Sequence, residues 1–143
     1  MSTTAGVLDA IEVVVDAISG LTISKTHEIA RLAGTISHDG YFVIDSPGGG
    51  DDEGSPGGDN ISRSALDVTI ELLQWVDPTD WTTARNAATG RMESIRNALD
   101  TASALASVDA YAKWVDWTWE KNFSPNYGLI TCSFLVYHSH TYS

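Results

Sequence analysis

Few residues of this 143-residue chain have the type and spacing that catalysis or metal binding requires. His138-Ser139-His140 would place two imidazoles on one face of a strand, where they could bind a metal ion. The sequence supplies no third ligand beside them, so we interpret the pair as an exposed strand end. A nucleophile elbow, a phosphate loop, Cys-x-x-Cys and His-Glu-x-x-His are all absent. We therefore expect no enzyme, no metal site and no cofactor.

A second group of possible metal ligands lies in residues 46–60. The carboxylates of Asp51, Asp52, Glu53 and Asp59 could bind calcium, but EF-hand spacing is absent and no glycine-aspartate repeat recurs. The segment has no large apolar residue, so we interpret it as a flexible Gly/Asp-rich loop between two strands. Such a loop can be ordered by a partner, and we nominate Asp51, Asp52 and Glu53 as partner contacts.

The charge of the chain is strongly acidic. Nineteen Asp and Glu residues against 8 Lys and Arg give a formal net charge of −11. Nucleic-acid binding needs clustered basic residues, so this class is disfavoured. One interpretation is a halophilic protein, because concentrated salt shortens the Debye length to about 3 Å and screens self-repulsion. The alternative is a mesophilic acidic domain that docks on a basic partner. The acidic residues are spread along the chain, which favours the halophilic source.

Cys132 and the N-terminal segment bear on where the protein works. Cys132 is the single cysteine, and we expect it to be a small buried hydrophobe in a protein assembled inside a cell. The apolar run 7–18 is interrupted by Asp9, Glu12 and Asp16. We therefore expect neither a signal peptide nor a membrane span.

Two segments have the period of an amphipathic helix. The first covers residues 4–19, with Thr3 or Thr4 as its cap and Gly20 as the left-handed residue that ends it. The second runs to about residue 102, with Asp77 as cap and Pro78 at its first position. Its apolar stripe contains Trp81, Ala84, Ala88, Met92, Ile95, Leu99 and Ala102.

Strands are predicted over residues 41–45 and 61–76, and over two alternating segments between Tyr111 and Tyr142 that a turn at 124–128 joins. Residues 21–34 fit either a short capped helix or an irregular strand. The order predicts one α+β domain over residues 1–143. It would have a mostly antiparallel sheet of two hairpins, with two main helices packed on one face.

The C-terminal hairpin carries large side chains on both of its expected faces. Alternation puts Trp117 and Trp119 on the core face and turns Trp114 away from them, and Leu135 and Tyr137 also lie opposite the core set. We interpret these five residues as a subunit or partner interface. Alternatively, they form the rim of the monomer's own core.

The order of elements resembles that of the small tail-terminator and tail-completion (neck) proteins of tailed viruses. The segments that carry the resemblance are the helix 7–18, the strands 41–45 and 63–72, the helix 81–99 and the closing strand 128–137. They cover most of the chain without a signature motif, and the acidic composition is similar to that expected for a virus of a halophilic archaeon. The long glycine-rich loop departs from the pattern.

The resemblance implies a structural virion protein, assembled in the host cytoplasm, that forms a ring, typically of six subunits, at the end of the tail tube or at the head–tail neck. Its partners would be the tail tube protein and other neck proteins, and DNA would pass through an acidic lumen without sticking. A head-closure or connector role in the same neck is an alternative. A hypothesis of another class is a small halophilic enzyme or ligand-binding domain, which His138 beside a buried carboxylate would favour.

Overall fold

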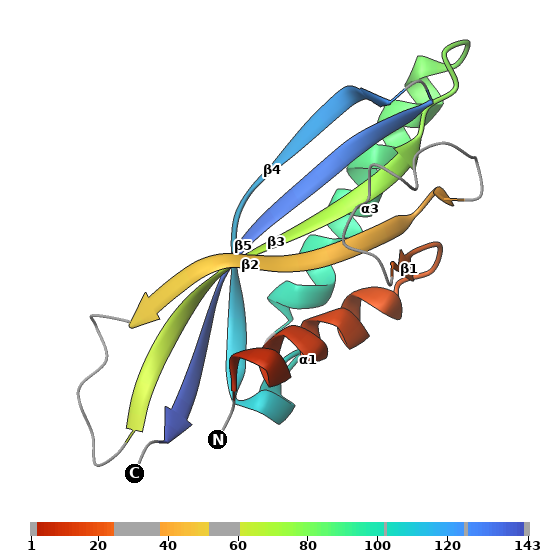
Figure 1. The fold of residues 1–143 in the computed structure, drawn as a ribbon. Helices are drawn as coiled ribbons and strands as arrows, with labels where there is room; N and C mark the ends of the chain where they lie inside the picture. Colours follow the sequence, from red (N-terminus) through yellow and green to blue (C-terminus); the bar gives the residue numbers. More distant parts are fainter. Residues whose placement is uncertain (1–2, 25–37, 52–60, 102, 125, 142–143) are drawn as a thin grey trace.

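The computed structural model describes residues 3–24, 38–51, 61–101, 103–124 and 126–141. The fold is α+β, as the sequence predicts, and Figure 1 shows its long twisted sheet. The elements in chain order are α1 (Thr4–Asp16), β1 (Thr22–Ile23), β2 (Tyr41–Asp51), β3 (Ile61–Trp75), α3 (Trp81–Asp100), the 3-10 helix η2 (Ala106–Val108), β4 (Ala110–Ser124) and β5 (Tyr127–Thr141).

The five strands form one mostly antiparallel sheet in the order β1-β2-β3-β5-β4. β2 and β3 form one antiparallel hairpin, β4 and β5 form the other, and β3 pairs with β5 in the middle of the sheet. The short β1 pairs with β2 in parallel. It answers part of the question left open for residues 21–34, because Thr22 and Ile23 are in a strand; residues 25–34 lie outside the described part of the chain.

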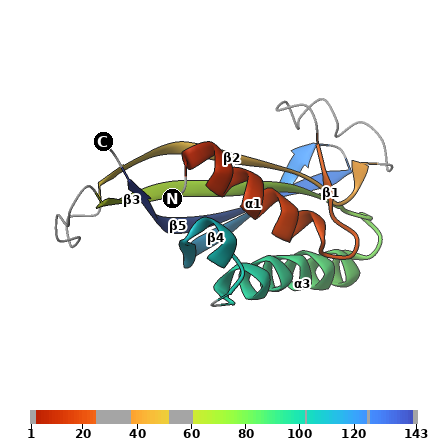
Figure 2. The same ribbon diagram turned by 90° about the horizontal axis from the view of Figure 1, so that it is seen from below.

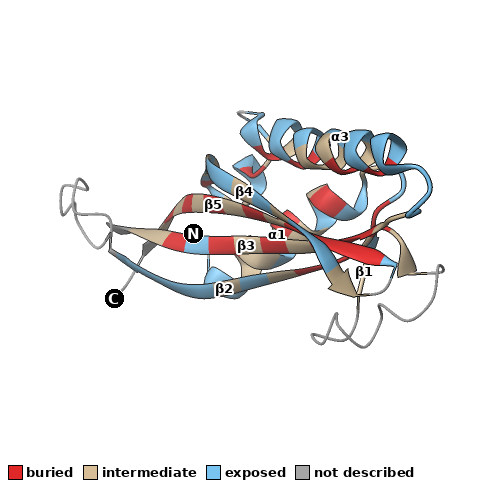
Figure 3. Cartoon of the chain, turned by 90° about the horizontal axis from the view of Figure 1, so that it is seen from above, coloured by how far each residue is buried: buried red, intermediate tan, exposed pale blue. Residues whose placement is uncertain are grey.

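Both helices pack on one face of the sheet (Figures 2 and 3). They bury most of the apolar stripes that the sequence predicts, against sheet residues such as Phe42, Ile70 and Phe134. Trp81, which the sequence predicts in the stripe of α3, is instead 41% exposed, and Ala102 lies outside the described residues. None of the helices in the described ranges is long and apolar enough to cross a membrane. The buried helix residues are Val7, Ile11 and Val15 of α1 and Ala84, Ala88, Ile95 and Leu99 of α3.

The helix ends differ from the predicted ones. The side chain of Thr3 caps α1 by accepting a hydrogen bond from the Gly6 amide at 3.0 Å, but the helix already ends at Asp16. Gly20 adopts the expected positive φ of 86° in the turn that follows. The prediction that Asp77 caps the second helix is wrong. Its carboxylate instead accepts from the amide and hydroxyl of Thr79, in a turn that precedes the true cap.

The cap of α3 is Asp80, whose carboxylate accepts from the amide of Thr83 at 3.2 Å and from its hydroxyl at 2.7 Å. Either aspartate can cap a helix in sequence terms, but only one can be the residue before the first helical turn. The turn formed by Asp77 moves the start of α3 to Trp81, and the helix ends at Asp100.

The predicted loop over residues 46–60 is wrong in its first part. β2 continues through Asp51, with Gly48, Gly49 and Gly50 paired against β3 after a register shift that follows Asp45. A Cβ at Gly49 would lie 2.6 Å from the Ala65 carbonyl oxygen, so glycine allows this close pairing. Backbone pairing alone therefore orders a segment without large side chains. Residues 52–60, including Asp52 and Glu53, lie outside the described residues.

Candidate functional site

The face of the sheet turned away from α1 and α3 is the candidate functional surface, and we call it the open face. Its members follow from strand register, because residues that pair across neighbouring strands share a face. Aromatic and apolar side chains lie at one end of this face, and polar side chains lie toward its middle. The residues of the open face are Asp45, Asp67, Thr69, Glu71, Tyr111, Lys113, Asp116, Thr118, Glu120, Thr131, Ser133, Leu135 and Tyr137.

Large side chains gather at one end of the open face. Tyr111 pairs with Tyr137 across β4 and β5, and their rings stack with centroids 5.0 Å apart and planes at 25°. Leu135 lies on the next rung, opposite Lys113. Tyr111 is 48% exposed although it is stacked. We call Tyr111, Tyr137 and Leu135 the tyrosine patch. It presents rigid aromatic area with polar hydroxyls, the composition that is enriched in protein interfaces.

The middle of the open face is polar and acidic. Asp45, Thr69, Ser133 and Asp116 form one continuous rung across four strands. The neighbouring rungs add Glu71 and further threonines. Its carboxylates keep this part of the face hydrated, so the tyrosine patch is bounded on one side by a wet, acidic surface.

The opposite end of the sheet has a second apolar cluster on the same side as the open face. Val43, Leu73, Tyr127 and Leu129 are buried there, with Trp75 and Phe123 packed against them. Tyr127 accepts a hydrogen bond from the His38 amide at 3.2 Å and stacks edge-on with Trp75 at 5.2 Å. Two buried clusters thus lie on opposite sides of one sheet, and the tyrosine patch is the exposed aromatic part of the second side.

The three tryptophans nominated as interface residues all lie on the helix-covered side. The register of β4 against β5 slips at Val115, so Trp114 faces the same way as Trp117 and Trp119 and packs into the main core. Its ring meets Phe134 edge-on at 5.2 Å, and the Arg96 guanidinium lies 5.1 Å above it. The prediction that Trp114 faces away is therefore wrong, because a bulge inserts one residue and reverses the alternation beyond it.

The bulge also changes which β4 residue is exposed. Val115 alternates in step with Trp117 and Trp119 in the sequence, but it is 57% exposed at the bulge. It lies near the tyrosine patch in sequence, on the outer strand of the sheet. Asp51 ends β2, with its backbone paired to Ser64, while Asp52 and Glu53 lie outside the described residues.

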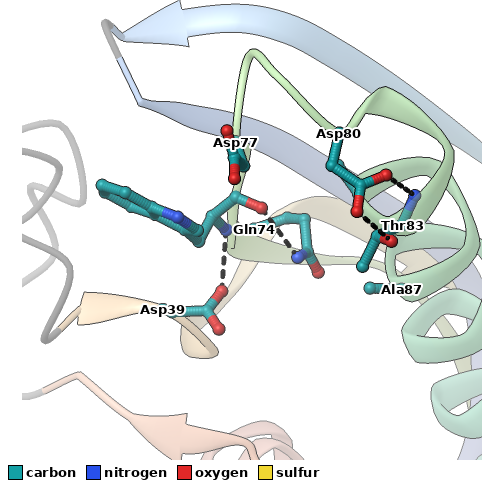
Figure 4. A pocket seen from close by; sticks show the side chains of 8 residues that line it. Asp39, Gln74, Asp77, Asp80, Thr83 and Ala87 are labelled. Atoms are coloured by element: carbon teal, nitrogen blue, oxygen red, sulfur yellow. Dashed lines mark hydrogen bonds between the residues drawn. The ribbon is translucent and has the colours of Figure 1, made fainter.

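A polar pocket of about 170 Å³ lies beside the start of α3 (Figure 4). Asp39 and Gln74 border it, and both bind Arg91 of α3. The guanidinium donates to both Asp39 carboxylate oxygens, at 2.7 and 3.1 Å, and to Gln74 Oε1 at 2.8 Å. Asp39 also accepts from the Trp75 amide at 2.7 Å. These contacts join the turn before β2 to β3 and α3, so we interpret the group as a structural latch.

His138 lines a second pocket, of about 260 Å³, together with Asp109 and the two stacked tyrosines. The histidine is 3% exposed, and Asp109 is an exposed residue with a positive φ of 52°. Its carbonyl accepts from the Ser139 amide at 3.4 Å. A buried carboxylate beside His138 would favour an enzyme or ligand-binding domain, and the carboxylate residue that shares this pocket, Asp109, is exposed. Among the described residues, no group of three or more His, Cys, Asp or Glu is placed to hold a metal ion.

The shifted pKa values have structural causes. Burial raises the pKa of the Cys132 thiol to about 12, so it is an unreactive core residue. Burial also raises the pKa of Tyr127. Hydrogen bonds from the Thr79 hydroxyl and then its amide lower the pKa of Asp77 in its exposed turn. Each shift follows from packing or turn formation and none pairs an acid with a base.

Neither a protein-family model nor a curated protein matches this chain. The chemistry of its surface is therefore the basis on which a function is assigned.

Proposed function

We propose that the protein is a structural virion subunit that forms a ring at the tail tube end or the head–tail neck of a tailed virus, as a tail-terminator or tail-completion protein. A virus of a halophilic archaeon is the proposed source, with six subunits the favoured number. The order of elements is the basis of the resemblance. The observation that carries the proposal is the exposed tyrosine patch on a sheet whose other face is already covered by helices.

The tyrosine patch suits assembly because stacked rings are rigid and lose little side-chain entropy when they are buried. Residues of this kind, when central in an interface, contribute a large share of its binding energy. Leu135 adds apolar surface on the next rung. The acidic middle of the open face would remain wet at the border of such a contact.

The outer edge of β4 is less suited to assembly by strand addition. A bulge at Val115 interrupts it, and Lys113, Asp116, Glu120 and Lys121 place charges along the strand. Bulges and charges on an outer strand are features that oppose edge-to-edge pairing. We therefore propose that a neighbouring subunit packs on the open face and not on this edge.

The charge of the chain fits a conduit for DNA. A ring of subunits that each carry a net charge of −11 would repel the phosphate backbone, so DNA would pass without being held. The tail tube protein and other neck proteins are the proposed partners. A head-closure or connector component of the same neck would use the same surface, and placement of the chain in a virion density map would separate these roles.

Substitution of Tyr111 by Asp tests the proposal. Asn86→Asp on α3 is a matched control, because it introduces the same charge at an exposed position on the helix side and keeps an oxygen for Arg85. In molar salt we expect Tyr111→Asp to remain a folded monomer while Asn86→Asp assembles like the wild type. Equal assembly of both variants would refute the assignment of the tyrosine patch.

A further inference from the structure

A third pocket, of about 400 Å³, lies where the β3–α3 connection meets the turn between β4 and β5. Its volume is in the range of small-molecule sites, and it lies at the opposite end of β4 from the tyrosine patch. The connection contributes two apolar residues, α3 contributes the ring of its first residue, and β4 contributes polar groups. The lining is Val76, Pro78, Trp81, Lys121, Asn122, Ser124 and Tyr127.

The charge of this pocket differs from that of the molecule. Lys121 is the charged residue among the described residues that line it, and none of them is a carboxylate. The Lys121 ammonium lies 5.4 Å above the Trp81 ring, a cation–π contact that leaves its hydrogen-bond donors available. Trp81 is 41% exposed although it begins a helix that packs on the core. In a chain with net charge −11, the lining of this pocket carries a positive charge and two aromatic rings.

A buried hydroxyl adds a second, independent observation. The Oγ of Ser124 is buried and has no hydrogen-bond partner among the described residues. The same holds for the indole nitrogen of Trp119, whose ring centroid lies 6.2 Å from that of Trp81. A buried polar atom without a partner costs free energy, so each such atom in a folded protein requires an explanation. A ligand that accepts a hydrogen bond from Ser124 would provide one.

We propose that this pocket binds a carboxylate carried on an apolar or aromatic body. Lys121 supplies the positive charge, and Ser124 and Asn122 supply hydrogen-bond donors for the carboxylate oxygens. Trp81, Val76 and Pro78 supply the apolar wall for the body of the ligand. The lining of the pocket comes from one chain and lies away from the tyrosine patch.

Titration with benzoate at constant ionic strength tests the site. Binding is followed by NMR through the indole N–H resonances of the tryptophans. Benzyl alcohol, which has the ring without the charge, is the control ligand. We expect benzoate to shift the Trp81 and Trp119 resonances and benzyl alcohol to bind more weakly. Lys121→Met should weaken the affinity for benzoate by about tenfold or more, because a charge-assisted hydrogen bond is lost. Lys113→Met, which removes the same charge from the other end of β4, should leave the affinity within about twofold.

Ser124→Ala separates binding from folding. Removal of a buried hydroxyl without a partner should leave the thermal stability unchanged or raise it, yet benzoate should bind more weakly. Benzoate shifts that are equal in the wild type, Lys121→Met and Ser124→Ala, or that are absent in the wild type, would overturn the proposal. A loss of stability in Ser124→Ala would also count against it, because the hydroxyl would then have a partner within the protein.

The carboxylate can belong to a free organic acid or to an acidic side chain of a second copy. Sedimentation of Lys121→Met beside the wild type distinguishes the two sources. Self-association reduced in Lys121→Met would place a second copy's acidic side chain in the pocket. Equal self-association of Lys121→Met and the wild type, with benzoate binding lost in Lys121→Met, would identify a free organic acid as the ligand.

Discussion

Removal of the latch arginine tests how β3 and α3 are held to the turn before β2. Arg91→Met keeps the length of the side chain while it removes the hydrogen bonds to Asp39 and Gln74. Gln74 is only 4% exposed, so its Oε1 would remain buried without its donor. The cost of such an unpaired atom is about 1–3 kcal/mol. The ion pair with Asp39 is partly exposed and adds about 1 kcal/mol at most.

The expected loss is therefore about 1–4 kcal/mol in the free energy of unfolding, or about 3–16 °C in Tm for a domain of this size. Arg85→Met is the matched control, because Arg85 lies on the same helix and, among the described residues, its side chain bonds its exposed neighbour Asn86. That variant should stay within about 0.5 kcal/mol of the wild type.

Thermal unfolding followed by circular dichroism, in the same salt for all variants, measures both effects. The double variant Arg91→Met with Gln74→Met removes both polar partners and should recover part of the loss, since the buried Gln74 side-chain oxygen is then absent. Equal Tm values for Arg91→Met and Arg85→Met would refute the interpretation of this group as a structural latch.

Three further predictions follow from the core and the sheet. Trp114→Ala should lower stability by about 2–3 kcal/mol, since the partly buried ring packs on Phe134 at the margin of the core, and a variant with unchanged chemical denaturation would contradict the bulge assignment. Gly128→Ala should lower the free energy of unfolding by about 1–3 kcal/mol, because the new Cβ would lie 2.4 Å from the Trp119 ring. Gly48→Ala is the control, since its Cβ meets no atom within 4 Å, and equal denaturation midpoints of the two variants would argue against this packing. Burial raises the pKa of Cys132 from 9.0 to about 12, so the thiol stays protonated in the fold while the unfolded chain ionises; stability should fall as pH rises from 9 toward 12, and Cys132→Ala should show a shallower fall in the same titration. An identical pH slope in that variant would show that other groups cause the loss.

The helices and central strands could be predicted from the sequence because their signals are local. The stripe of α3 and the alternation of Leu66, Val68, Ile70 and Leu72 in β3 each report a buried face directly. Pairing of the two hairpins then follows from element order. The α+β class and the helices on one face of the sheet are confirmed for that reason.

The errors of the sequence-based prediction arise where one inserted residue shifts the alternation of a strand, or where backbone pairing determines how far a strand extends. The bulge at Val115 reverses the face of Trp114, and no side-chain pattern in β4 announces the inserted residue. Gly48–Gly50 pair with β3 through their backbones, which composition does not reveal. Asp77 and Asp80 both have the features of a helix cap, and only the observed turn shows which of them precedes α3.

The sites were harder to predict than the elements because their residues are distant in sequence. Leu135 and Tyr137 could be placed opposite the core from alternation, but the stacking of Tyr137 on Tyr111 depends on the register of β4 and β5. The contact of Arg91 with Asp39, and the meeting of Trp81 with Lys121, join segments that local periodicity does not connect. Such contacts depend on the tertiary packing of the two hairpins and α3, which local sequence patterns do not report.

The mass of the assembled protein in molar salt tests the central proposal most directly. Sedimentation velocity of the wild-type chain, alone and with the tail tube protein, measures it without a change to the surface. We predict a closed ring of several subunits, with six favoured, that Tyr111→Asp reduces to monomers. A wild-type chain that stays a monomer in both conditions would contradict the proposal.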